Sequence, residues 1–109
     1  MKFLLSIIFV IYCSTLVESY AQEVDPIISE NCNFFGNDLS DAEGYSIKIS
    51  GIDKDQCKEE CIRNPECTHF TLSELGCFLK HADTKQTALN SKHDYEGSFC
   101  GLLETRFTS

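Results

Sequence analysis

The stretch Asp55–Phe70, "DQCKEECIRNPECTHF", carries three cysteines and governs the interpretation of the whole chain. Three residues separate the first two cysteines, and a proline stands between the second and the third. Such a cluster can bind a metal, supply a nucleophile or form disulfides. The compartment in which the chain folds decides among these, because disulfides persist where the surroundings are oxidising.

The first residues of the chain have the pattern of a secretory signal peptide. Lys2 precedes the apolar run Phe3–Val17, and small residues follow at Ser19 and Ala21. A membrane anchor is the alternative, but the apolar run is shorter than the roughly 20 residues that span a bilayer. We therefore predict cleavage after Ala21, and expect a secreted, extracellular protein without a membrane span once residues 1–21 are removed.

The cysteines of the remaining chain form an even set. Cys13 lies in the signal segment, so six of the seven cysteines remain, namely Cys32, Cys57, Cys61, Cys67, Cys77 and Cys100. A chain this short has a marginal apolar core and needs cross-links. An even set in an oxidising compartment predicts three disulfides, although six cysteines allow fifteen pairings.

Neither a metal site nor a catalytic thiol fits these cysteines. A structural zinc site uses CxxC spacings or closely spaced histidines, whereas Cys57 and Cys61 are spaced CxxxC and the histidines are scattered at His69, His81 and His93. A catalytic thiol needs a free cysteine beside a base, and an even count leaves none over. We therefore expect no metal and no cofactor.

Asp53 and Pro65 delimit a helix around the first two cysteines of the cluster. Asp53 can cap a helix with Gln56 as its capping-box partner, and Pro65 prevents continuation, so the predicted helix runs over Lys54–Asn64. The two cysteines lie four residues apart, on one face of this helix. Both sulfurs therefore point at whatever the helix covers.

Short β-compatible runs lie on both sides of the predicted helix. Thr68–Ser73 and Cys77–His81 flank the turn Glu74–Gly76 and predict a hairpin. Tyr45–Ile49 alternates apolar and polar residues, which predicts a strand with one buried face formed by Tyr45, Ile47 and Ile49. The expected fold is therefore α+β, with one helix packed on a small antiparallel sheet.

From Cys32 to Cys100 the chain resembles a PAN/Apple module. The matching core positions are Cys57, Cys61, Cys67, Phe70, Cys77 and Phe78, with Asn64, Pro65 and Glu66 in the helix-exit turn. The outer pair, Cys32 and Cys100, matches the longer Apple version. The resemblance implies the pairs Cys32–Cys100, Cys57–Cys77 and Cys61–Cys67.

The resemblance also divides the chain. Residues 22–31 are expected to form a short N-terminal extension, 32–101 the domain and 102–109 a C-terminal strand or tail. Strict alternation would place Cys67 on the face opposite Phe70, so we expect Cys67 in a turn or bulge before the strand. In the tail, Leu102, Leu103 and Phe107 either complete the sheet or form an exposed edge.

Known catalytic motifs are absent from the sequence. It contains no GxSxG elbow, no HExxH pair and no Gly-rich phosphate loop. Asp38, Asp41 and Glu43 form an acidic loop, but the EF-hand spacing is missing and we interpret the loop as solvated. We therefore expect a protein that is not an enzyme.

The net charge of the chain limits the classes of partner that it can bind. The formal net charge is −8, which opposes binding to nucleic acid, heparin and anionic membranes. Some modules of the resembled family bind sulfated glycans through basic patches. Here the nearest approach to one is the group Lys80, His81, Lys85 and Lys92, which we interpret as a solvated loop.

The polar, turn-rich stretch His81–Phe99 is expected to be a loop, where recognition residues tend to lie. Tyr95 is the best candidate contact, because an aromatic ring can stack on a sugar or fill a protein pocket. Packing at a strand edge is its other interpretation. The candidate ligand-binding residues are Lys80, His81, Asp94, Tyr95 and Glu96.

The resemblance implies a monomeric recognition module whose partner is an extracellular protein or a glycan. Secreted single-module relatives of this size bind host matrix protein, so a matrix-binding or inhibitory protein that acts on a host partner is one alternative. A purely structural secreted protein is another. Fold alone does not choose among these functions.

Overall fold

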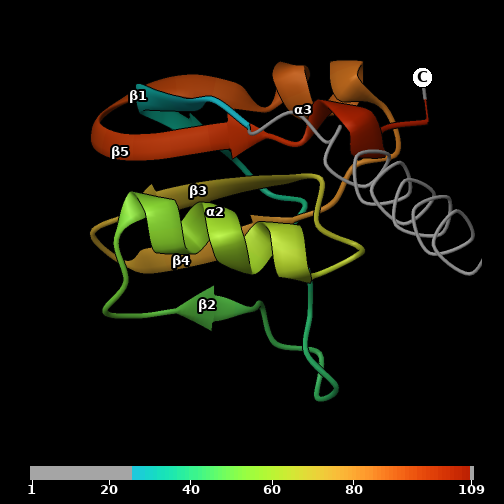
Figure 1. Cartoon of the computed structure of the whole chain (residues 1–109), viewed down its shortest axis with the longest axis horizontal. Helices are drawn as coiled ribbons and strands as arrows, with labels where there is room; N and C mark the ends of the chain where they lie inside the picture. The colour runs from blue at the N-terminus through green and yellow to red at the C-terminus, as the bar shows by residue number, and fades with distance from the viewer. Residues whose placement is uncertain (1–25, 109) are drawn as a thin grey trace, which may run out of the picture.

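The computed structural model describes residues 26–108, so the predicted signal peptide lies outside the described residues. Five strands form one antiparallel sheet in the order β1-β5-β3-β4-β2 (Figure 1). The strands are β1 (Ile28–Phe34), β2 (Lys48–Ile49), β3 (His69–Ser73), β4 (Gly76–Lys80) and β5 (Lys92–Leu102). The helices are α2 (Lys54–Arg63), α3 (Lys85–Asn90) and the 3-10 turn η1 (Glu104–Arg106). The α+β class with one main helix on an antiparallel sheet is confirmed.

Helix α2 begins with the expected capping box. The Asp53 carboxylate accepts a hydrogen bond from the Gln56 backbone N–H at 2.8 Å, and the Gln56 side chain accepts one from the Asp53 N–H at 2.9 Å. The helix ends at Arg63, one residue before the predicted end. Cys57 and Cys61 are its two fully buried residues, as their shared face predicts.

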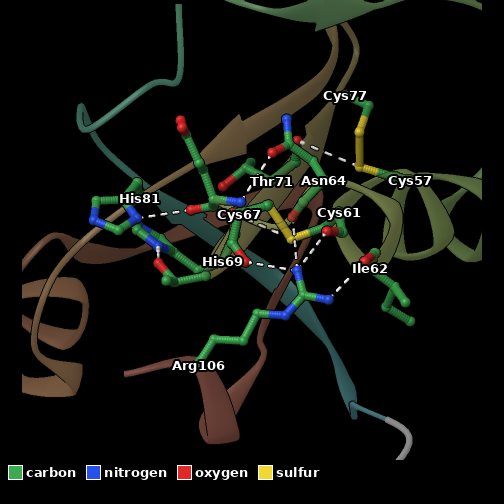
Figure 2. The surroundings of a disulfide bond; sticks show 12 residues. Cys57, Cys61, Ile62, Asn64, Cys67, His69, Thr71, Cys77, His81 and Arg106 are labelled. Carbon is green, nitrogen blue, oxygen red and sulfur yellow. Dashed lines mark hydrogen bonds between the residues drawn. A yellow bond between two sulfur atoms is a disulfide. The ribbon is translucent and has the colours of Figure 1, made fainter. Parts of the chain in front are cut away.

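Arg106 closes the other end of α2. Its guanidinium donates hydrogen bonds to the carbonyl oxygens of Cys61, Ile62, Asn64 and Cys67 at 2.6–3.1 Å (Figure 2). The last carbonyls of a helix have no partner within the helix, and a cation there also interacts favourably with the helix dipole. A residue far along the chain therefore caps this helix and ties η1 to it.

The first core lies between α2 and one face of the sheet. Phe70 of β3 and Leu79 of β4 pack there against the bonded pairs Cys57–Cys77 and Cys61–Cys67, together with Leu103. The β3–β4 turn is tighter than predicted, because β4 begins at Gly76 and only two residues remain in the turn. Cys67 precedes the first residue of β3, as expected.

The expected loop His81–Phe99 is wrong, because this stretch contains α3 and most of β5. Neither element has a strong sequence signal: α3 is six residues long, and the first half of β5 is polar and exposed on both faces. Pairing with β1 defines β5 as a strand, and the sequence of β5 alone does not reveal that pairing.

β1 and β5 form a ribbon that bends back on itself (Figure 1). Glu30 pairs with Phe99 but Cys32 pairs with Asp94, so the residues Tyr95–Ser98 face Asn31 alone. Asn31 adopts a positive φ of 56° and its side chain accepts a hydrogen bond from the Gly97 N–H at 3.0 Å. This large bulge bends both strands at the same point.

The returning half of the ribbon covers the second face of the sheet. The Phe34 N–H donates to Thr71 Oγ1 at 3.0 Å, and the rings of Phe34 and His69 meet edge to face at 4.9 Å. The disulfide Cys32–Cys100 joins this half to the part of β5 that pairs with β3. β3 is therefore buried on both faces.

The three disulfides are Cys32–Cys100, Cys57–Cys77 and Cys61–Cys67, the pairs that the resemblance implies. They span 68, 20 and 6 residues of sequence. The longest joins the two ends of the domain, the second joins α2 to β4, and the shortest closes the exit of α2. The two longer disulfides thus cross-link separate parts of the fold, and the shortest closes a local turn.

The predicted strand Tyr45–Ile49 is confirmed only in its second half, where Ile47 and Ile49 pack against the core. Only Lys48–Ile49 pairs with β4, and Tyr45 is 73% exposed rather than buried. Asp41 explains the difference, because its carboxylate accepts from the N–H groups of Glu43 and Tyr45 and forms a tight turn. Part of the predicted acidic loop is thus a turn that the Asp41 side chain stabilises.

Of the three C-terminal residues expected to complete the sheet or to form an exposed edge, only Leu102 lies in a strand. Leu102 pairs with His69 and Leu103 is only 4% exposed. The chain then turns through η1, and the ring of Phe107 lies 6.4 Å from that of His69. No helix among residues 26–108 is long and apolar enough to cross a membrane.

The disulfides should contribute unequally to stability. Chain entropy predicts that losing Cys32–Cys100, which spans 68 residues, lowers the free energy of unfolding by about 4 kcal/mol, and losing Cys61–Cys67 by about 2 kcal/mol. Denaturant melts of the two double alanine variants measure this difference. An equal loss in both variants would show that unfolded-chain entropy does not set their contributions.

The Arg106 cap should stabilise the fold measurably. The change Arg106→Met keeps the apolar stem but leaves four carbonyl oxygens without their charged donor, and should cost about 2 kcal/mol. Arg63→Met is the matched control, because Arg63 is exposed and only pairs with Glu60. Its expected cost is below about 0.5 kcal/mol in the same thermal melts. Equal melting of the two variants would contradict the capping role.

Candidate recognition surface

The outer face of the returned β1–β5 ribbon carries aromatic side chains. Cys32 and Phe34 point inward to the sheet, so alternation directs Asn33 and the following Phe35 outward. His93 pairs with Asn33, and Tyr95 lies two residues further along the same strand. Phe35 and His93 therefore share one face, and Tyr95 follows at the start of the bulge; we term these three residues the aromatic row.

The aromatic row is accessible to a partner. Phe35 is 55% exposed and Tyr95 46% exposed, although both are large aromatic residues. The rings of Phe35 and His93 meet edge to face, with centroids 5.0 Å apart. A backbone bond from the Phe35 N–H to the Ser91 carbonyl at 2.9 Å holds the start of the row. The rings of Phe35 and His93 thus project from hydrogen-bonded backbone, which limits the freedom that binding would remove.

Carboxylates flank the row. Asp94 and Glu96 stand on either side of Tyr95 in β5, and both are exposed. Carboxylates accept hydrogen bonds from sugar hydroxyls and from the cationic side chains of proteins. Asp94, Tyr95 and Glu96 are therefore consecutive exposed residues, and Asp94, which pairs with the inward Cys32, lies on the face opposite His93.

Lys80 is not part of this surface, and its interpretation as a solvated or ligand-binding residue is wrong. It is only 4% exposed, and its ammonium donates to the Gly36 carbonyl at 2.9 Å and to the Asp38 carboxylate. The cation thus anchors the segment after β1 over β4. The sequence around Lys80 gave no sign that this residue is buried, because its partners Gly36 and Asp38 are more than forty residues away.

His81 is exposed but already has two partners. Its ring nitrogens lie 2.7 Å from the Glu66 carbonyl oxygen and 3.1 Å from the Asp83 carboxylate. These two contacts, the backbone one foremost, raise the pKa of His81 above its ordinary value. The imidazole therefore links the turn after α2 to the segment before α3, and we assign it a structural role.

Two members of the aromatic row were not singled out from the sequence. Phe35 follows the inward Phe34 directly, so the pair "FF" does not show which ring is exposed. His93 lies in the stretch expected to be a loop, where alternation was not applied. The signal that would have found His93 is the alternation of His93 and Tyr95 in "KHDYEG", once this stretch is recognised as a strand.

His69 is the most unusual titratable group of the domain. It is fully buried, with Nδ1 2.9 Å from the Thr68 hydroxyl, and within residues 26–108 its Nε2 has no hydrogen-bond partner. Burial, reinforced by the charge of Lys80, lowers the pKa of His69 to about 4. The imidazole is therefore neutral at physiological pH and packs as an aromatic ring against Phe34.

Metal-ligand geometry is not found in the part of the chain that the structure describes. No group of three or more His, Cys, Asp or Glu side chains in residues 26–108 is arranged to hold an ion. The six cysteines there are all bonded in pairs.

Comparison with known families agrees with this architecture. Residues 29–101 match the model of the PAN domain. The chain belongs to the PAN domain family. A search of curated proteins finds no match. PAN domains are generally non-catalytic modules that bind proteins or carbohydrates, and a PAN domain with three disulfides is typical of extracellular proteins. The family and the accessible aromatic row therefore both indicate binding.

The buried His69 should make this PAN domain less stable in mild acid. Because the folded pKa is lowered to about 4 while the unfolded value is 6.5, the unfolded chain takes up the proton first as the pH falls. The free energy of unfolding should thus decline between pH 6.5 and 4, by up to about 3 kcal/mol.

Urea melts of the protein and of His69→Gln across this pH range measure that contribution. The variant should have the flatter profile, whatever its stability at pH 7. His81→Gln is the control, because the raised pKa of His81 acts in the opposite direction and its loss should leave the decline in place. Parallel profiles for the protein and His69→Gln would contradict the assignment.

Proposed function

We propose that this PAN domain is a secreted recognition module that binds an extracellular carbohydrate or protein through the aromatic row. The observation that carries the proposal is the exposure of Phe35, which contacts His93, and of Tyr95 on the same β1–β5 ribbon. The signal-peptide pattern supports secretion. Family membership supports binding rather than catalysis.

The chemistry of the row favours a sugar without negative charge. Aromatic faces stack on the apolar C–H faces of sugar rings, and the Asp94 and Glu96 carboxylates can accept hydrogen bonds from hydroxyl groups. The net charge of −8 opposes sulfated and other acidic glycans. A protein partner for the same surface would present cationic side chains to these carboxylates.

A glycan array probed with the oxidised protein tests the proposal. We expect selective binding to neutral or amino sugars, and loss of most of the signal in Tyr95→Ala and Phe35→Ala, since each removes a stacking face. Tyr45→Ala is the matched control, because Tyr45 is also an exposed tyrosine, 73% against 46% for Tyr95, and lies in a turn elsewhere in the chain. Its array signal should equal that of the unchanged protein.

The opposite pattern is equally informative. Binding that persists in Tyr95→Ala but disappears in Tyr45→Ala would place the site outside the aromatic row. A blank array from a folded sample would exclude the sugar, and affinity capture from extracellular matrix with the same variants would then test the protein partner. Capture that is insensitive to Phe35→Ala and Tyr95→Ala would overturn the site in that case as well.

A further inference from the structure

A cavity of about 510 Å³ lies at the end of the sheet where β1 begins and β5 runs into η1. It extends from Phe34 on the returned ribbon to Ile62 in the last turn of α2. Ile27, Leu102 and Leu103 are among its apolar lining residues. None of the lining residues belongs to the aromatic row, so this is a separate site.

The cavity is large for so small a domain. Its volume lies within the roughly 300–1,000 Å³ that is typical of pockets for small molecules. Each water molecule takes about 30 Å³ in the liquid, and an apolar wall gives it few hydrogen-bond partners. The lining is therefore suited to an apolar group rather than to a cluster of water.

The rim of the cavity carries an uncompensated positive charge. Glu104 is a rim residue, but its carboxylate pairs with the Lys85 ammonium at 2.8 Å. Lys92 is the other charged residue of the lining, and within residues 26–108 its ammonium makes no ion pair. The hydroxyls of Ser29 and Thr105 add polar groups that can orient a ligand head.

We propose that this cavity binds a small amphipathic molecule with a linear apolar chain and one negatively charged head, of the class of fatty-acid carboxylates. The chain lies along Ile62, Leu102 and Leu103, and the head contacts the Lys92 ammonium. Charge complementarity favours a negatively charged head, because the Glu104 carboxylate is paired with Lys85 and the Lys92 ammonium can contact the ligand. The apolar lining selects the chain.

The other group that could fill the cavity is the chain's own segment Gln22–Asp25, which directly precedes the lining residue Pro26. The two occupants differ in a measurable way. A cavity filled by the chain takes up no added amphiphile, whereas an available cavity does.

Isothermal titration of the oxidised protein tests the proposal. It uses three probes of equal chain length, each kept below its critical micelle concentration. The probes are dodecanoate, dodecanol and dodecyltrimethylammonium. We expect dodecanoate to bind best, dodecanol more weakly and the cation least. Methyl NMR shifts of Ile62, Leu102 and Leu103 should change with dodecanoate and so locate the chain.

Three variants separate the contributions of the head and the chain. Lys92→Gln should weaken dodecanoate by about fivefold and leave dodecanol unchanged, because an exposed ion pair is worth up to about that factor. Lys48→Gln is the control, since Lys48 is an exposed lysine in β2. Thr105→Trp places a ring at the rim and should weaken dodecanoate and dodecanol alike.

Several outcomes would overturn the proposal. They are no binding of any probe, equal binding of dodecanoate and the cation, or dodecanoate affinity that is the same in Lys92→Gln and Thr105→Trp as in the unchanged protein. Glycan or protein binding to the aromatic row is a separate measurement, so failure here leaves the proposed function standing and the converse also holds.

Discussion

The disulfides are the interaction on which the rest of this structure depends, because they are also a large part of its core. Half of the buried apolar residues in 26–108 are half-cystines, and each of the six is at most 3% exposed. A domain this small buries too little aliphatic surface to be more than marginally stable without cross-links. The sulfur atoms therefore cross-link the chain and fill its interior at the same time.

Burial of β3 on both faces follows from these cross-links. Phe70 faces α2, which Cys57–Cys77 and Cys61–Cys67 hold in place. His69 and Thr71 face the returned ribbon, which Cys32–Cys100 holds in place. The polar residues of the second face are tolerated because they are bonded to one another or to backbone, with His69 Nε2 the exception.

The parts of the fold that could be predicted are those whose signals are local. A capping box, a proline and a CxxxC spacing define α2 within one residue, and a short turn defines the β3–β4 hairpin. The ribbon could not be predicted, because its bend needs Asn31 and Gly97 to meet across more than sixty residues of sequence.

The same reasoning separates the candidate site residues. Asp94, Tyr95 and Glu96 were expected at the surface, and all three are exposed in β5. Lys80 looked like a surface cation, because nothing near it in the sequence shows that Gly36 and Asp38 receive its ammonium. Local patterns thus identify exposed groups better than they identify buried ions, whose partners come from distant segments.

The engaged cations affect which anions this acidic protein could accept. Lys80 and Arg106 are engaged inside the domain, and Lys85 is paired with Glu104. The exposed surface is therefore poorer in available positive charge than the composition indicates, and a polyanion that spans it meets repulsion over its whole length. At physiological salt, however, charges interact over only about 8 Å. A ligand with a single negative group beside Lys92 feels mainly that lysine, so local attraction at the cavity and repulsion of extended polyanions are compatible in one molecule.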